Sequence, residues 1–242
     1  MCAMATDGAV TLYYDNAVKL ATATGGISVT GNADFTASRL FVGAIADVNN
    51  QGIRLQDNSS GRLNQMSMAT DGAFLLKQHT GAAWAERFRI TPNGNITAPA
   101  QSSFYATCAA LVNKTGGATT TYLVGSAGYT WTEVQDRNAD FDGAGLFTAP
   151  VAGFYHMSGT MQWTGLNTAT SAIAYLVVSN GNIQILHNPT NIANVGVNYN
   201  INISQVVYMD ASDTAQLAMY INGAGSDVCD LDNAQFSGYL LG

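Results

Sequence analysis

A span of 67 residues, positions 143–209, contains no Asp, Glu, Lys or Arg. A monomeric domain normally keeps charged residues on its surface for solubility. A span of this length without charge therefore favours one of two arrangements. Either its surface is built from amide and hydroxyl side chains, or much of it is buried between subunits. The residues alone leave both alternatives open.

The apolar residues of this region recur with a period of two. One set alternates with amides and a serine over positions 197–204, and comprises Val197, Tyr199, Ile201 and Ile203. The same pattern recurs over 215–221, and both indicate strands with one apolar face. Asn180-Gly181 separates two apolar runs and supplies the positive φ that tight hairpins require. No long segment has the period of an amphipathic helix, so the pattern predicts an all-β sandwich.

The charges divide the chain in two. Up to Pro99 there are seven acidic and seven basic residues, whereas the remainder carries nine acidic residues against Lys114 and Arg137, so the net charge of -7 belongs to the second part. This shift predicts a domain boundary, with domains at 1–100 and 101–242. It also argues against a nucleic-acid partner, because phosphates require a basic surface.

Two separated motifs carry a family resemblance. They read FDGAGLFTAPVAGFY at 141–155 and FSGYLL at 236–241. They resemble the signature of the globular heads of complement first component q, which share the tumour-necrosis-factor-like jelly roll. The resemblance covers about 103–242 and implies a ten-stranded jelly-roll head that forms a homotrimer and binds a ligand.

The first hundred residues contain an internal repeat. The sequence MATDGA occurs at 4–9 and again at 68–73, and each copy leads into a short apolar run and later a Gly-Asn turn. Two copies offset by 64 residues indicate a repeat unit. The text DGAVTLYYDN at 7–16 resembles the shaft repeats of bacteriophage tail fibres and other virion appendages. That resemblance implies a shaft of short strands intertwined as a trimer.

The strands expected in the first part are short and poor in apolar residues. They lie at 39–45, 52–57, 63–68 and 84–90, and 93–102 is the expected junction with the head. Such strands cannot bury a core alone. Threefold wrapping would supply partners and remove open sheet edges. The alternative is an ordinary small β domain of a single chain.

The sequence shows no targeting segment. It lacks a signal peptide and any apolar window long enough to span a membrane, so no membrane insertion is expected. Because a repeat follows Met1 almost at once, we expect a C-terminal piece of a longer chain or a start that docks on other virion proteins. Cys2, Cys108 and Cys229 form an odd set, which fits assembly in a reducing host cytoplasm. A Cys108–Cys229 disulfide is the alternative.

Catalytic patterns are absent from the sequence. There is no nucleophile elbow, no phosphate-binding Gly-rich loop and no zinc-type His pair. His79, His156 and His187 stand apart, and we expect His156 to be packed. Glycoside hydrolysis needs two carboxylates across the sugar bond, yet Glu86 and Glu133 are the two glutamates. We therefore expect no enzyme, and keep a tailspike-like polysaccharide depolymerase as the weaker alternative.

Calcium is the cofactor to consider. Positions 138–149 begin like an EF-hand loop, but Ala149 stands where a bidentate Glu is needed. Five aspartates near the C-terminus could instead supply oxygens from loops at a trimer axis, where like charges would repel without a cation. These weak candidates are Asp210, Asp213, Asp227, Asp230 and Asp232. The alternative is that they are solvated turn carboxylates.

Two functions fit the sequence. The first is a virion tail-fibre or receptor-binding protein, assembled in the host cytoplasm, whose three heads bind a bacterial surface glycan or outer-membrane receptor multivalently. Aromatic rings cover sugar faces and amides pair with hydroxyls. The candidate contacts are Trp163, Asn167, His187, Asn188, Asn191, Asn194 and Tyr199. The second is a purely structural role as a trimerisation, capping or decoration protein of the virion.

Overall fold

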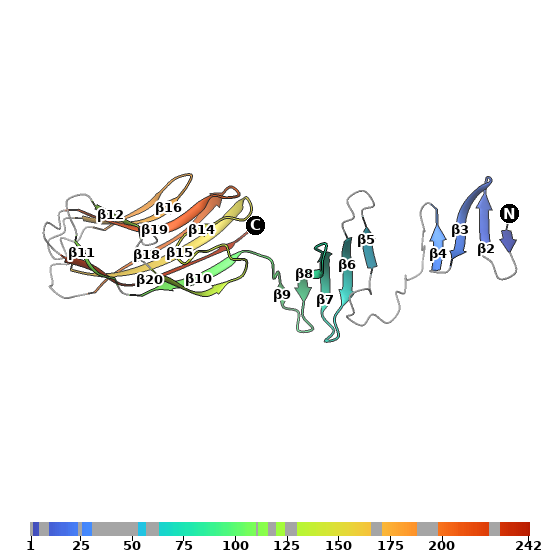
Figure 1. Ribbon diagram of the computed structural model, residues 1–242, viewed down its shortest axis with the longest axis horizontal. Coiled ribbons are helices and arrows are strands. Elements are labelled where there is room, and N and C mark those ends of the chain that lie inside the picture. The colour runs from blue at the N-terminus through green and yellow to red at the C-terminus, as the bar shows by residue number, and fades with distance from the viewer. Residues whose placement is uncertain are drawn as a thin grey trace.

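The computed structural model describes residues 2–4, 10–23, 26–30, 53–56, 63–109, 111–115, 120–123, 130–165, 171–187, 198–222 and 228–242. Across these residues the protein is all-β, as expected, with four sheets. Two small sheets precede a two-sheet head along the chain (Figure 1). No helix in this part of the chain is long and apolar enough to cross a membrane.

The two small sheets are antiparallel meanders. The first has the order β1-β2-β3-β4, from β1 (Cys2–Met4), β2 (Val10–Tyr14), β3 (Ala17–Ala23) and β4 (Gly26–Val29). The second, which we call the neck sheet, has the order β5-β6-β7-β8-β9, from β5 (Ile53–Gln56), β6 (Leu63–Met68), β7 (Phe74–His79), β8 (Trp84–Ile90) and β9 (Ile96–Thr97). The strands predicted at 63–68 and 84–90 are confirmed, that at 52–57 is present as 53–56, and 39–45 lies outside the described residues.

The repeated MATDGA sequence connects paired strands in both copies. Met68 pairs with Phe74 across the β6–β7 turn, and Met4 pairs with Val10 across the β1–β2 connection. In the second copy the Asp71 carboxylate accepts a hydrogen bond from the Ala73 amide at 3.0 Å, while Gly72 has φ +86°. Asp and Gly suit these two positions because Asp closes a local turn and Gly has no Cβ to clash at positive φ.

The head is a sandwich of a six-stranded and a five-stranded sheet. The first has the order β13-β10-β20-β15-β18 with β11 also on β20, and the second has β12-β19-β16-β17 with β14 also on β19. Its strands are β10 (Ser103–Cys108), β11 (Leu111–Thr115), β12 (Thr120–Leu123), β13 (Trp131–Asp136), β14 (Phe147–Thr148), β15 (Gly153–Thr164), β16 (Ser171–Val178), β17 (Ile183–His187), β18 (Tyr199–Met209), β19 (Thr214–Asn222) and β20 (Val228–Leu240). This antiparallel connectivity, in which the chain crosses repeatedly between the two sheets, is that of a jelly roll.

The head strands follow the predicted alternation. β16 and β17 pair through the Asn180-Gly181 turn. β18 covers the first predicted period-two segment from Tyr199 onward, Val197 lying outside the described residues, and β19 covers the second. The labelled strands exceed the expected ten because β10 and β11 occupy successive stretches of the same side of β20. They therefore act as one interrupted strand of the sheet.

The two sequence motifs meet in the core of the head. Phe104 of β10 stacks on Phe141 and Phe147, with ring centroids 4.8 and 4.9 Å apart, and meets Phe236 edge-on at 5.0 Å. Phe147 in turn contacts Tyr155 at 5.5 Å, and all five rings are buried. The aromatic residues of the two motifs thus belong to a single cluster, to which both sheets contribute.

Cys108 lies in this core as a free thiol. The suggested disulfide with Cys229 is therefore not formed. The Cys108 sulfur is directed toward the Ala109 carbonyl at 3.5 Å, and burial raises the pKa of its thiol. A small buried Cys behaves as a core hydrophobe.

Candidate binding face of the head

The outward side of the six-stranded sheet is a candidate binding surface, and we call it the outer face. Strand register places its residues in rows that run across the sheet. At the end nearest the neck, the first row joins Phe154 to Tyr208, with Leu241 beside Phe154. The second row joins Ser103, Tyr239, His156 and Val206. The neck end of the outer face is therefore mainly aromatic and aliphatic.

The aromatic residues of this end contact one another while remaining accessible. The rings of Phe154 and Tyr208 lie 5.4 Å apart and are 53% and 48% exposed. Tyr239 is 47% exposed and lies 5.2 Å from the ring of His156. Leaving such large apolar groups in water costs free energy, so a cluster of them indicates a surface that another molecule covers.

His156 lies on the outer face, where it is partly buried and packs against the Tyr239 ring, and it is not part of the core. Its Nε2 lies 3.0 Å from the Ser204 hydroxyl. Alternation in the sequence does not show which residues of this strand face the core, because the adjacent residues Phe154 and Tyr155 are both aromatic. Pairing decides the question: Tyr155 points inward and donates its hydroxyl proton to the Val151 carbonyl at 2.8 Å.

Beyond the aromatic end, the next three rows of the outer face are polar and uncharged. The third row is rich in hydroxyls and contains Gln135, Tyr105, Ser237, Ser158 and Ser204. The next rows carry Thr107, Gln235, Thr160 and Asn202, followed by Asn233, Gln162 and Asn200. Asn233 donates from Nδ2 to Gln162 Oε1 at 2.9 Å. Two explanations were given for the absence of charge from positions 143–209. On this face the first of them holds, because the exposed residues are amides and hydroxyls.

Arg137 lies at the edge of these rows. Arg137 follows β13, and its backbone N–H donates to the Ser103 carbonyl at 3.2 Å, so it extends the second row. The side chain is exposed. Sequence reasoning counted Arg137 as a basic residue of the head but did not place it, because only the pairing of β13 with β10 brings it beside Tyr239.

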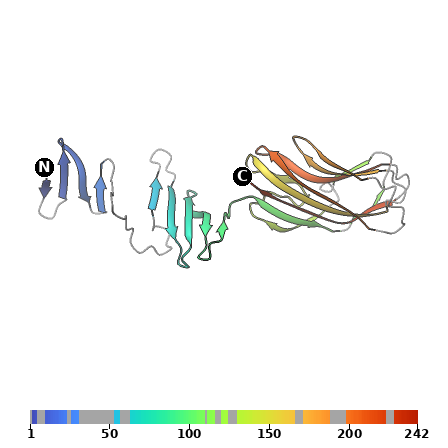
Figure 2. The same cartoon turned by 180° about the vertical axis from the view of Figure 1, so that it is seen from behind.

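The neck sheet has an apolar face of its own. Register aligns Ile53, Met66, Leu76 and Phe88 in one row, and Met68, Phe74, Ile90 and Ile96 in the next. Of these, Ile96 is 65% exposed, and Ile53, Met66, Met68 and Leu76 lie between 36% and 41%. The described strands of this segment form a single layer, as the two opposite views show (Figures 1 and 2). A single layer leaves this face without a covering sheet.

The receptor contacts proposed from sequence are dispersed. Trp163 is fully buried in the core, which corrects its assignment as a contact residue. Tyr199 pairs with it at the start of β18, is half-buried, and has its pKa raised by burial. His187 ends β17. The remaining candidates lie outside the described residues: Asn167, Asn188, Asn191 and Asn194.

The acidic candidates do not share one place in the head. Asp210 and Asp213 follow Met209, which pairs with Gly153, whereas Asp230 pairs with Thr164 at the other end of β15. The twelve residues of β15 separate these ends by roughly 36 Å. Asp230 and Asp232 lie in a strand and not in a loop, which corrects the expectation, and Asp227 lies outside the described residues. Within the described part of the chain no three acidic, His or Cys side chains are grouped to hold a metal.

Asp213 has a local structural role. Its Oδ1 accepts a hydrogen bond from the Ser179 hydroxyl at 2.9 Å, and its Oδ2 accepts one from the Asp210 backbone N–H at 2.9 Å. Ser179 Oγ also accepts from the Thr214 N–H at 2.9 Å. This carboxylate therefore ties the end of β16 to the β18–β19 turn.

The chain is similar to several solved structures. The globular domain of zebrafish complement 1qA is 17% identical, with a TM-score of 0.37 over 58% of this chain and 98% of that one. Murine APRIL is 8% identical, with a TM-score of 0.39 over 58% and 99%. The PRD1 vertex protein is 10% identical, with a TM-score of 0.41 over 58% and 97%. No protein-family model matches the chain, and no curated protein matches it by sequence.

Proposed function

We propose that this protein is a virion appendage protein, part of a tail fibre or a similar structure, whose trimeric head attaches a phage to a saccharide on a bacterial surface. The observation that carries the proposal is the neck sheet, a single layer with two apolar rows open on one face. A sheet of this kind is not stable alone in water and needs an apolar partner. Copies of the same chain are that partner.

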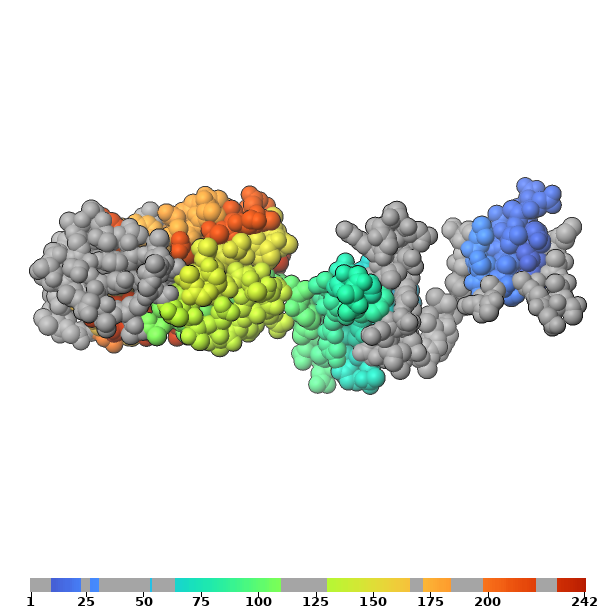
Figure 3. Space-filling model, viewed as in Figure 1, coloured from blue at the N-terminus to red at the C-terminus, as the bar shows by residue number. Residues whose placement is uncertain are grey.

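The neck region and the head sheet that follows it support the same assembly. The MATDGA repeat precedes a strand in both small sheets and is similar to the shaft repeats of tail fibres. The small sheets and the head follow one another along the longest axis of the molecule (Figure 3). An elongated series of thin sheets ending in a sandwich suits a shaft that carries a head.

The aromatic end of the outer face is the proposed contact between heads. Phe154, Tyr208 and Val206 are each about half exposed and lie on neighbouring strands. Exposed aromatics clustered in this way are the residues that dominate the energetics of subunit interfaces. Three heads packed through Phe154, Val206 and Tyr208 would bury these three side chains.

The uncharged hydroxyl and amide surface supports saccharide recognition. Amides and hydroxyls both donate and accept hydrogen bonds, which matches sugar hydroxyls. The net charge of -7 offers no attraction to an anionic cell surface. Recognition through specific hydrogen bonds, multiplied by three heads on one shaft, supplies the affinity that bulk charge cannot.

Two measurements test the proposal. Light scattering on the full chain should give about 76 kDa, three times the 25.4 kDa chain mass. The labelled trimer should then adsorb to some strains of a bacterial panel, and purified capsule or lipopolysaccharide from those strains should compete. A monomeric mass would refute the assembly.

The same experiments separate the alternatives. A trimer that adsorbs to no strain and binds no polysaccharide would favour the purely structural role in capping or decoration. Shortening of the polysaccharide during incubation would identify a depolymerase, because a binder leaves polymer length unchanged. Unchanged length with competed adsorption supports attachment.

A further inference from the structure

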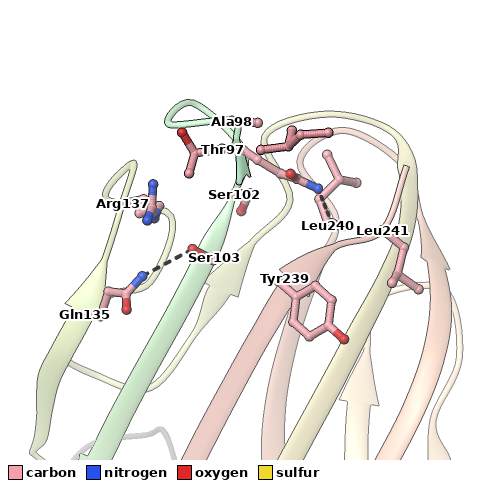
Figure 4. Close-up of a pocket in the computed structure, with 11 residues that line it drawn as sticks. Thr97, Ala98, Ser102, Ser103, Gln135, Arg137, Tyr239, Leu240 and Leu241 are labelled. Carbon is pink, nitrogen blue, oxygen red and sulfur yellow. Dashed lines mark hydrogen bonds between the residues drawn. The ribbon is translucent and has the colours of Figure 1, made fainter. Parts of the chain in front are cut away.

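A hollow of about 480 Å³ lies where the neck joins the head, and we call it the collar pocket (Figure 4). Its size falls in the range of sites that hold small ligands. Ile96 of β9 belongs to its wall, together with Gln101, Gln135, Arg137, Tyr239 and Leu241. We propose that the collar pocket binds a saccharide that carries a carboxylate, such as a uronic or sialic acid unit. The proposal rests on the proposed saccharide attachment and assigns it a place and a sugar class.

Arg137 is the anion-binding group. Arg137 and Gln135 stand at one side of the hollow, and Leu240 and Leu241 at the other (Figure 4). The ion pairs among the described residues involve Arg89 and not Arg137. A guanidinium binds a carboxylate through two parallel hydrogen bonds, which gives both affinity and orientation.

The acidic residues beside Arg137 are engaged in holding the loop. The Asp136 carboxylate accepts hydrogen bonds from the backbone N–H groups of Asn138, Asp140 and Phe141 at 3.3, 3.2 and 3.0 Å. Asp140 accepts one from the Ser102 hydroxyl at 2.7 Å. These bonds fix the backbone around Arg137 and occupy the nearest carboxylates, so the guanidinium is left for a ligand in a head that is otherwise acidic.

Tyr239 provides a surface for the sugar ring. Ser103 of β10 pairs with Tyr239 of β20 and accepts the Arg137 N–H through its carbonyl, so the three lie in one row. Adjacent strands are about 4.8 Å apart, which places Arg137 and Tyr239 about 10 Å apart along the row. A sugar ring on the tyrosine can then direct its carboxylate toward the guanidinium. Aromatic rings cover the apolar faces of sugars while their polar edges stay wet.

Two amides complete the site. Gln135 donates from Nε2 to the Ser103 hydroxyl at 3.4 Å, and Gln101 donates from Nε2 to the Leu240 carbonyl at 2.6 Å. Each bond uses the NH₂ group and orients the amide, leaving its oxygen as an acceptor for a sugar hydroxyl. The pocket therefore combines a cation, an aromatic surface and oriented acceptors, which together match an acidic sugar better than a neutral one.

Calorimetry on the full chain tests the proposal with matched sugars. The probes are tetragalacturonic acid and its full methyl ester, and sialyllactose against lactose. We expect at least one acid to bind and its neutral partner to bind at least tenfold more weakly. Equal binding of acid and neutral partners, or binding of none of the four sugars, would overturn the proposal. Which acid binds distinguishes a uronic from a sialic ligand.

Variants then locate the site. Arg137→Gln should weaken binding of the acid at least tenfold, Arg137→Lys should restore part of it, and Tyr239→Ser should weaken binding of the acid as well. Arg87→Gln, which removes the same charge from the exposed surface of β8, should leave binding unchanged. An unchanged affinity in Arg137→Gln with an unchanged melting temperature would exclude this pocket. Adsorption to bacteria without binding of acidic sugars would reject the pocket assignment while leaving the attachment role intact.

Discussion

Gly238 lies directly opposite Phe104 across the β10–β20 ladder, and the absence of its side chain makes room for the aromatic cluster. A Cβ at Gly238 would lie 2.7 Å from Phe104 Cε1, 2.4 Å from Met157 Sδ and 3.3 Å from the His156 carbonyl oxygen. We expect Gly238→Ala to lower the free energy of unfolding by about 1–3 kcal/mol, because overpacking displaces the rings. Gly143→Ala is the control, since a Cβ there meets nothing within 4 Å. Equal stability of the two variants in urea unfolding would contradict this account.

The exposed ring pair offers a direct test of head association. Replacing Phe154 and Tyr208 together by Ser should convert the proposed trimer of about 76 kDa toward the 25.4 kDa chain, because each aromatic anchor of an interface contributes about 2 kcal/mol or more. Val134→Ser is the matched control, with an apolar side chain 59% exposed on β13. Light scattering over a range of concentrations measures the effect. Retention of the trimer by the double variant would place the contact elsewhere.

A charge in the neck sheet should disrupt assembly from the other end. Leu76 occupies the middle of an apolar row, and Leu76→Lys would bury an ammonium group against a partner chain. We expect the concentration for half-dissociation to rise at least tenfold. Asn93→Lys adds the same charge at an exposed position of the turn between β8 and β9 and should have little effect. Identical dissociation curves for the two variants would show that the open face is not a subunit contact.

Tyr155 predicts how stability changes at alkaline pH. Burial raises its pKa, and the nearby Asp140 charge adds to the shift. The folded state thus favours the neutral phenol. The stabilisation that results is fully present below the unfolded pKa of about 10 and is lost as pH rises above that value. Tyr155→Phe should lose about 1 kcal/mol at pH 7 through the missing hydrogen bond, yet fall less steeply above pH 10. Urea unfolding at both pH values measures this, with the exposed Tyr239→Phe as the control. Parallel pH profiles for wild type and Tyr155→Phe would be the contrary result.

Substitution of Asp213 tests whether its carboxylate acts through hydrogen bonds or by binding calcium. Loss of its two hydrogen bonds in Asp213→Ala should lower stability by about 1.5–3 kcal/mol. We expect the same loss in excess calcium and in EDTA, measured by thermal unfolding. Asp232→Ala, at the other end of the head, should have a smaller effect. A wild-type melting temperature that falls in EDTA would instead revive a cation site.

Much of the fold could be predicted because alternation and turn residues are local signals. The Asn180-Gly181 hairpin and the strands around Ile201 and Leu217 follow directly from them. The faces of the strands were harder to predict. Trp163 belongs to the core and His156 to the surface, because pairing across three strands determines which side each residue occupies. The collar pocket was beyond prediction, since Arg137 and Tyr239 are about a hundred positions apart in sequence and meet only through β10.

The separate cores of the two parts have a consequence for how a chain of this design can change over time. The buried cluster of Ala69, Ala73 and Leu75 in the neck sheet shares no residue with the large cluster of the head. The MATDGA sequence recurs where one strand ends and its partner begins. Duplication of this unit would lengthen the chain by a further sheet without repacking the head. The length of the N-terminal part can therefore vary through the number of repeats, while the binding surface of the head varies independently through substitutions.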